Sequence, residues 1–112
     1  IPQMAHYFTI MQGLRGCYMP DNRYTIQCAT RRELKSALES EAYSIRDAGY
    51  VGCSKRDIAA LAAECWRRRK GWPYDLVAPY RDADQDHCPY GLMVAHATRA
   101  DYLEYVAECD SF

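Results

Sequence analysis

The chain has 112 residues, of which 49% are hydrophobic and 26% are charged, as is typical of one globular domain. Lys and Arg together number 14 and Asp and Glu 15, which argues against a dedicated nucleic-acid-binding domain with its strongly basic surface. No segment has the length of a membrane span or the pattern of a signal peptide, so we expect a cytoplasmic protein without membrane contact. We predict one compact domain over residues 4–112, with Met4 as the native start and residues 1–3 added by an expression vector.

A β-hairpin is predicted near the start of the chain. Tyr7–Ile10 is rich in aromatic and β-branched residues and predicts a strand, and Tyr24–Cys28 predicts the returning strand. Pro20–Arg23 has the composition of a turn. Gly13–Gly16 predicts a bulge or bend in the first strand.

Two amphipathic helices are predicted next. Thr30 and Glu33 have the spacing of a capping box at the start of the first helix, and Ser54 caps the second, with Asp57 in its first turn. Apolar residues recur at helical spacing in both segments. These positions are Leu34, Leu38, Ala42 and Ile45 in the first helix, and Ile58, Leu61, Ala62 and Cys65 in the second.

The second helix is predicted to end in the basic string Arg67–Lys70. Cations in a last turn complement the helix dipole, and Gly71 and Pro73 then stop the helix. A helix end therefore explains the string more simply than a nucleic-acid grip, given a pI near 6.3.

Two further strands and a last helix complete the predicted fold. The strands are expected at residues 76–78 and 92–95, and Thr98 caps a helix with Asp101 in its first turn. The order β-β-α-α-β-β-α predicts an α+β domain with a small antiparallel or mixed sheet and helices packed on one face. The residues of the last helix expected to face inward are Tyr102, Leu103, Val106 and Cys109.

The cysteines do not have the spacing of a metal site. No two lie within five positions, so the paired ligands of zinc sites are absent, and we expect reduced thiols, no metal and no cofactor. Asp82–Asp86 begins like a calcium loop, but His87 and Met93 stand where that loop needs Gly and Glu. The six cysteines are Cys17, Cys28, Cys53, Cys65, Cys88 and Cys109.

Catalysis has little support in the sequence, and we do not expect an enzyme. The histidines are His6, His87 and His96, and none lies in a recognisable nucleophile or metal motif. His96 alternates with apolar residues of its strand, which favours a partly buried histidine. A Cys–His pair assembled in space stays open, because such partners need not be close in sequence.

A second class of function is suggested by residues 44–69. Their pattern resembles a helix-turn-helix, although Asp47 and Gly49 depart from it. If the match holds, Lys55 and Arg56 face the major groove, and Arg69 and Lys70 contact DNA as well. This is the alternative to protein binding; specific nucleic-acid recognition is not our first expectation.

Protein binding is our first expectation. The chain has ten tyrosines and only two phenylalanines, too many tyrosines for a small core, and Tyr and Arg are favoured at interfaces. The acidic segment Asp82–Asp86 is the alternative contact face. The predicted contact residues are Arg15, Tyr18, Arg67, Arg68, Trp72 and Tyr80.

The stretches YFTIMQGLRGCYMPDNRYTIQC and TRRELKSALESEA belong to a short chain that resembles the small accessory proteins of temperate bacteriophages of Gram-negative bacteria. The resemblance implies a protein in the bacterial host's cytoplasm that acts by binding and blocking a host protein. Such targets include CRISPR effectors, pilus motors and transcription or quorum-sensing regulators. The resemblance does not choose among these partners.

Overall fold

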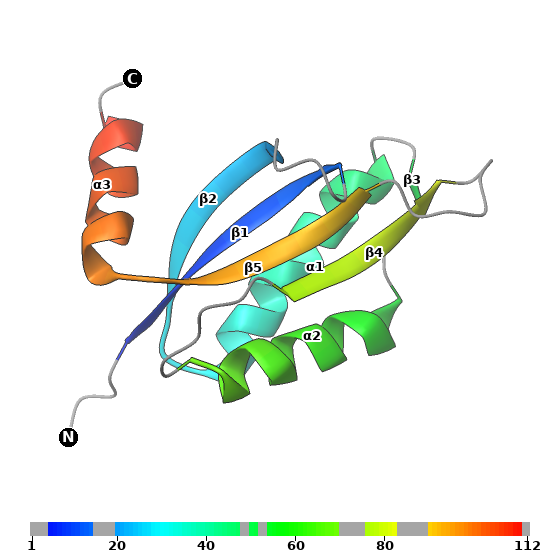
Figure 1. Ribbon diagram of the computed structural model, residues 1–112, viewed down its shortest axis with the longest axis horizontal. Coiled ribbons are helices and arrows are strands. Elements are labelled where there is room, and N and C mark those ends of the chain that lie inside the picture. Colours follow the sequence, from blue (N-terminus) through cyan, green and yellow to red (C-terminus); the bar gives the residue numbers. More distant parts are fainter. Residues whose placement is uncertain are drawn as a thin grey trace.

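A computed structural model describes residues 5–14, 20–47, 50–51, 54–69, 76–82 and 90–110. Side chains are described at residues 5–12, 23–44, 54–69 and 91–110. The elements, drawn in Figure 1, are β1 (His6–Leu14), β2 (Pro20–Cys28), α1 (Arg31–Asp47), β3 (Tyr50–Val51), α2 (Lys55–Arg67), β4 (Leu76–Asp82), β5 (Tyr90–Ala97) and α3 (Arg99–Asp110).

The strands form one five-stranded sheet in the order β2-β1-β5-β4-β3, and every neighbouring pair is antiparallel. β1 therefore lies inside the sheet, between the next strand of the chain and β5 (Figure 1). The predicted α+β class and order of helices and longer strands are confirmed. The two-residue β3 was not predicted, and the turn predicted at Pro20–Arg23 is wrong, because Pro20 already pairs with Gly13.

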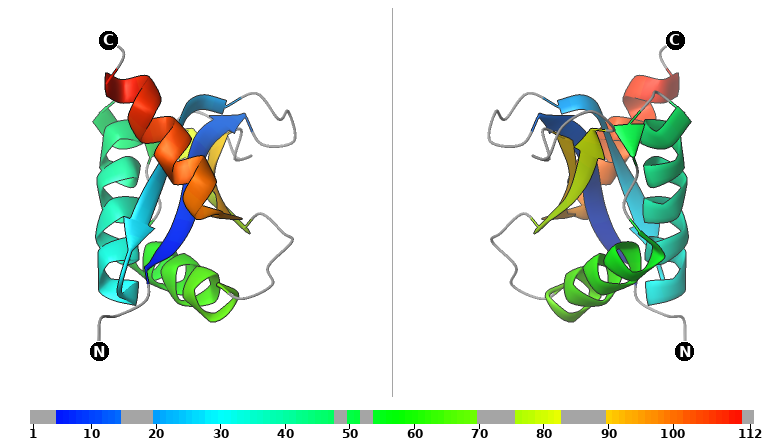
Figure 2. Two further views of the ribbon diagram at one scale, coloured as in Figure 1. Left: turned by 90° about the vertical axis from the view of Figure 1, so that its left-hand side faces the viewer. Right: turned by 90° about the vertical axis from the view of Figure 1, so that its right-hand side faces the viewer.

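The core lies between one face of the sheet and the helices α1 and α2. Phe8 and Ile10 of β1 are completely buried there, and Ile26 and Tyr24 of β2 pair with them in register. Figure 2 shows α1 along one side of the strands. The apolar positions predicted for these helices are buried wherever their side chains are described, namely Leu34, Leu38, Ala42, Ile58, Leu61, Ala62 and Cys65.

The opposite face of β1 and β2 is more polar. Thr9 and Thr25 are both buried and share a hydrogen bond of 3.2 Å between their hydroxyls. Tyr7 alternates with the buried Phe8, and its ring lies 5.4 Å from that of Tyr102 on α3. The third helix therefore packs beside the edge strand β2 and apart from the pair α1 and α2 (Figure 1).

Each helix begins at a hydrogen-bonded cap. In α1, the Glu33 amide donates to Thr30 Oγ1 over 3.2 Å, and the Glu33 carboxylate accepts from the Ala29 amide. Ser54 and Asp57 form a reciprocal capping box in α2. Such caps contribute about 1 kcal/mol each, and they fix where the helices start.

Candidate functional site

The predicted contact residues are only partly visible in the structure. Arg67 and Arg68 lie at the end of α2, and Tyr80 lies on β4, where side chains are not described. The other predicted contact residues, Arg15, Tyr18 and Trp72, fall outside the described residues, as does most of the acidic segment Asp82–Asp86. The candidate DNA-binding residue Lys70 and the histidine His87 also lie outside them.

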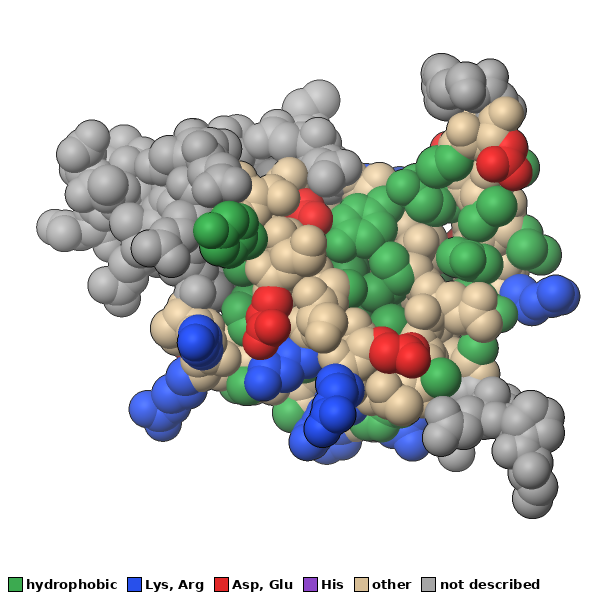
Figure 3. Space-filling model, turned by 180° about the vertical axis from the view of Figure 1, so that it is seen from behind, with side chains coloured by type: hydrophobic (Ala, Val, Ile, Leu, Met, Phe, Trp, Pro, Cys, Tyr) green, Lys and Arg blue, Asp and Glu red, His purple; other side chains and the backbone are tan. Residues whose placement is uncertain are grey.

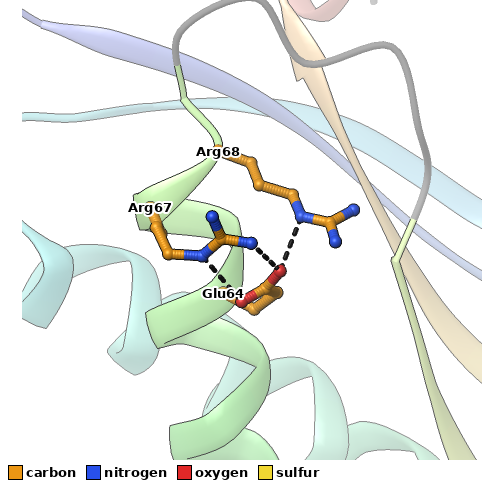
Figure 4. A network of polar contacts seen from close by, with 3 residues as sticks. All are labelled: Glu64, Arg67 and Arg68. Carbon is orange, nitrogen blue, oxygen red and sulfur yellow. Dashed lines mark hydrogen bonds and ion pairs between the residues drawn. The ribbon is translucent and has the colours of Figure 1, made fainter.

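Glu64 of α2 forms ion pairs with both Arg67 and Arg68 at the end of the helix, so its single carboxylate offsets part of their positive charge (Figure 4). Glu64 accepts from Arg67 Nη2 at 2.5 Å and pairs with Arg68 Nε at 2.6 Å. The hydrogen bond from Arg67, followed by the charges of both guanidinium groups, holds the pKa of Glu64 below its usual range. This end of the helix therefore presents less free positive charge than its sequence suggests.

Arg69 is held close to the helix as well. Its guanidinium lies 4.7 Å from the centre of the Trp66 ring, and Nη1 donates to the Trp66 carbonyl at 2.7 Å. Trp66 packs in turn against the core, edge-on to His6 at 5.1 Å. Arg69 is thus a packing residue of the helix end.

The candidate DNA-binding residues do not form one patch. Lys55 and Arg56 are exposed at the start of α2, whereas Arg69 follows its end. Thirteen helical residues separate the two ends by about 20 Å. The connection from α1 to α2 also contains β3, which pairs with β4, whereas a helix-turn-helix joins its helices by a simple turn.

The helix α3 has an unusual environment. It is described along its whole length, and none of its residues is buried. The prediction that Leu103 and Cys109 face inward is wrong: 47% of Leu103 is exposed and Cys109 is also exposed. Only Tyr102, Tyr105 and Val106 are half-buried. The helix forms a ridge beside β2.

An open apolar groove of about 490 Å³ lies on one side of this ridge. Its walls include Ile26 of β2 and Tyr102, Val106 and Cys109 of α3. Viewed from behind, hydrophobic side chains gather around a hollow at this end of the molecule (Figure 3). We call this surface the apolar groove.

A smaller, acidic groove of about 280 Å³ adjoins the apolar groove between α3 and β2. Asp101, Glu104 and Glu108 line it from the helix, and Arg23 lines it from β2. Three carboxylates therefore face one guanidinium, which leaves this acidic groove with an excess of negative charge.

Two tyrosines border both grooves, namely Tyr24 of β2 and Tyr105 of α3. Burial, reinforced by the charge and hydrogen bond of Glu41, raises the pKa of Tyr24. A hydrogen bond with Cys109 raises the pKa of Tyr105. Both phenols therefore stay neutral at physiological pH, and their rings form a shared aromatic border.

This site at α3 was not predicted, although the sequence carries a pattern that points to it. Asp101, Glu104 and Glu108 stand at i, i+3 and i+7, the spacing of a single helix face. Tyr102, Tyr105 and Cys109 have the same spacing one residue later. The helix therefore carries an acidic stripe next to a stripe of tyrosine and cysteine side chains, which indicates a surface that can contact both charged and apolar groups.

The described part of the chain shows neither a metal site nor a membrane span. It holds no group of three or more His, Cys, Asp or Glu side chains arranged to bind a metal ion. None of the helices in the described ranges could cross a membrane, because none is long and apolar enough. His96 is exposed, so the prediction that it is partly buried is wrong.

No known protein family, curated protein or solved structure shows significant similarity to this chain.

Proposed function

We propose that this protein is a non-enzymatic protein-binding module, a phage-type inhibitor or modulator that covers the surface of a bacterial host protein in the cytoplasm. The observation that carries the proposal is α3, an ordered helix without a buried side chain that exposes Leu103 and forms one wall of the apolar groove. In this proposal the contact surface is centred on α3 and β2.

A helix that folds against a domain normally buries an apolar stripe. In α3 that stripe is only half-covered, and the groove beside it exposes Ile26, Tyr102 and Val106 together. Exposed apolar surface bordered by charged residues is characteristic of interaction sites. Aromatic side chains such as Tyr102 and Tyr105 provide large contact areas at such sites.

The described residues that were first predicted as contacts have a minor role in this proposal. Arg67 is well exposed, but Glu64 binds both it and Arg68, so a partner would have to compete with that carboxylate. We therefore expect the basic end of α2 to contribute less binding energy than α3.

Affinity capture from lysate of a Gram-negative bacterium tests the proposal. We expect one saturable partner that is retained by the wild-type protein and lost with Leu103→Arg. The matched control is Ala60→Arg, which places the same side chain on the exposed side of α2. Loss of the partner with both variants, or retention with both, would contradict a contact surface at α3.

A different result would indicate that the protein is an enzyme. If no partner is recovered, and the protein converts a small molecule in a reaction that depends on His96 or Cys109, the proposal is wrong. Both side chains are exposed, so their substitution by Ala should leave the fold intact.

A further inference from the structure

We infer that the surface formed by α3 and β2 binds a lysine- or arginine-bearing segment of the partner protein, with the cationic side chain in the acidic groove and a neighbouring apolar side chain in the apolar groove. This inference rests on the proposed function and specifies the partner's chemistry. It is carried by three features of the described residues that meet at Tyr24 and Tyr105.

The first feature is the row of carboxylates. Asp101, Glu104 and Glu108 line the acidic groove over two turns of helix, a length of about 10 Å. Arg23 is the single cation among the residues that line this groove. The remaining negative charge complements a basic segment and repels both an acidic segment and the phosphates of nucleic acid.

The second feature is the pair of neutral tyrosine rings beside those carboxylates. A cation over an aromatic face is attracted by the ring's electron density, and a guanidinium or ammonium group close to a carboxylate gains an ion pair as well. The protein already uses such a contact at the end of α2, where Arg69 lies over Trp66. Tyr24 and Tyr105 line the acidic groove, where their rings can contact a guest cation.

The third feature is the position of the apolar groove. It shares Tyr24, Thr25 and Tyr105 with the acidic groove, so one bound segment can contact both. Lys and Arg have long aliphatic stems that pack on apolar surface while the charged group contacts polar partners. A basic side chain followed by an aliphatic one therefore matches the acidic groove and the apolar groove next to it.

A lysine–leucine peptide of helical period, labelled with a fluorophore, is the probe. We expect it to bind the wild-type protein and to bind the double variant Glu104→Gln/Glu108→Gln about tenfold more weakly, since each exposed ion pair contributes a fewfold effect. Glu39→Gln removes an exposed carboxylate of α1 and should change the Kd less than about twofold. Fluorescence anisotropy measures the Kd of the peptide for the wild type and for both variants.

The tyrosine contact is tested separately. Tyr105→Phe keeps the ring and should retain binding, whereas Tyr105→Leu keeps an apolar side chain without a π face and should weaken it several-fold, about two- to fivefold. Circular dichroism checks that each variant is folded. A peptide with Glu in place of Lys should not bind.

The inference is overturned if the Glu peptide binds as well as the Lys peptide, or if Glu104→Gln/Glu108→Gln and Glu39→Gln have equal effects.

A different result separates the proposed function from this inference. A captured partner that depends on Leu103 but not on Glu104 or Glu108 would keep the binding function and reject the basic segment.

Discussion

The hydroxyl of Tyr24 on the edge strand β2 donates a hydrogen bond to the carboxylate of Glu41 on α1. Only 7% of Glu41 is exposed, so this contact places a buried carboxylate at the junction of sheet and helix. The same tyrosine borders both grooves beside α3. Tyr24 therefore connects the core to the proposed binding surface.

Removing that hydroxyl should destabilise the fold. Tyr24→Phe deletes one hydrogen bond to the buried Glu41, and we expect the free energy of unfolding to fall by about 1–3 kcal/mol. Tyr43→Phe is the matched control, because 64% of Tyr43 is exposed on the same helix as Glu41. Urea unfolding of both variants measures the difference, and equal stabilities would show that the Tyr24–Glu41 contact contributes nothing.

Substitution of two leucines should distinguish the buried core from the exposed helix α3. Leu38 is completely buried on α1, and Leu38→Ala should cost about 2–5 kcal/mol of stability through lost packing and the cavity it leaves. Leu103 is exposed, and Leu103→Ala should stay within about 0.5 kcal/mol of the wild type. Denaturant unfolding compares them. A large loss for Leu103→Ala would mean that α3 has a covering contact.

The carboxylate of Glu64 should limit binding to DNA. Glu64→Gln leaves Arg67 and Arg68 without their shared partner, so we expect tighter but still sequence-independent binding that weakens steeply with salt. Glu39→Gln makes the same charge change elsewhere and is the control. Anisotropy titrations with duplex DNA at several salt concentrations provide the measurement.

A different DNA result would favour the alternative function. A specific footprint on one duplex, abolished by Lys55→Ala/Arg56→Ala and unaffected by Glu64→Gln, would support the helix-turn-helix hypothesis. Both basic side chains are exposed at the start of α2, so their removal should not unfold the protein.

The cap of α3 should respond to acid. Hydrogen bonds from the Thr98 amide and hydroxyl to the Asp101 carboxylate, each 2.9 Å, hold the pKa of Asp101 below its usual range. A carboxyl whose pKa is lower in the folded state adds stability at pH values above its unfolded pKa, near about 3.9. That contribution is lost as the pH falls through the lower, folded value.

NMR titration of the Asp101 carboxyl carbon and the Thr98 amide checks this prediction. Both chemical shifts should change together, at pH values below the usual pKa range of Asp. Asp101→Asn should remove the pH-dependent change at Thr98. A titration at or above the usual Asp value would show that the cap does not form in solution.

Local features of this fold could be predicted from the sequence because they depend on neighbouring residues. The caps at Thr30, Ser54 and Thr98 and the buried stripe that includes Ile58 follow from spacing alone. The two-residue β3 is too short to have a period, so nothing in the sequence distinguished it from a loop.

The environment of α3 could not be predicted in this way. Helical spacing shows that Tyr102, Val106 and Cys109 share a face, but not whether another element covers that face. The answer depends on the strand order, which places β2 at the edge and α3 beside it. The proposed surface consequently combines residues far apart in the sequence, such as Tyr24 and Tyr105, and this pairing has no local pattern.

The interior position of β1 in the sheet has a consequence for synthesis of the chain. Tyr7 pairs with Ala97, so one side of β1 finds its partner only after β5, about 90 residues later in the chain, has been synthesised. Until then the hairpin of β1 and β2 has an open edge that can pair with other chains. We expect slow, topology-limited folding and a need for chaperone protection during translation until β5 pairs with β1.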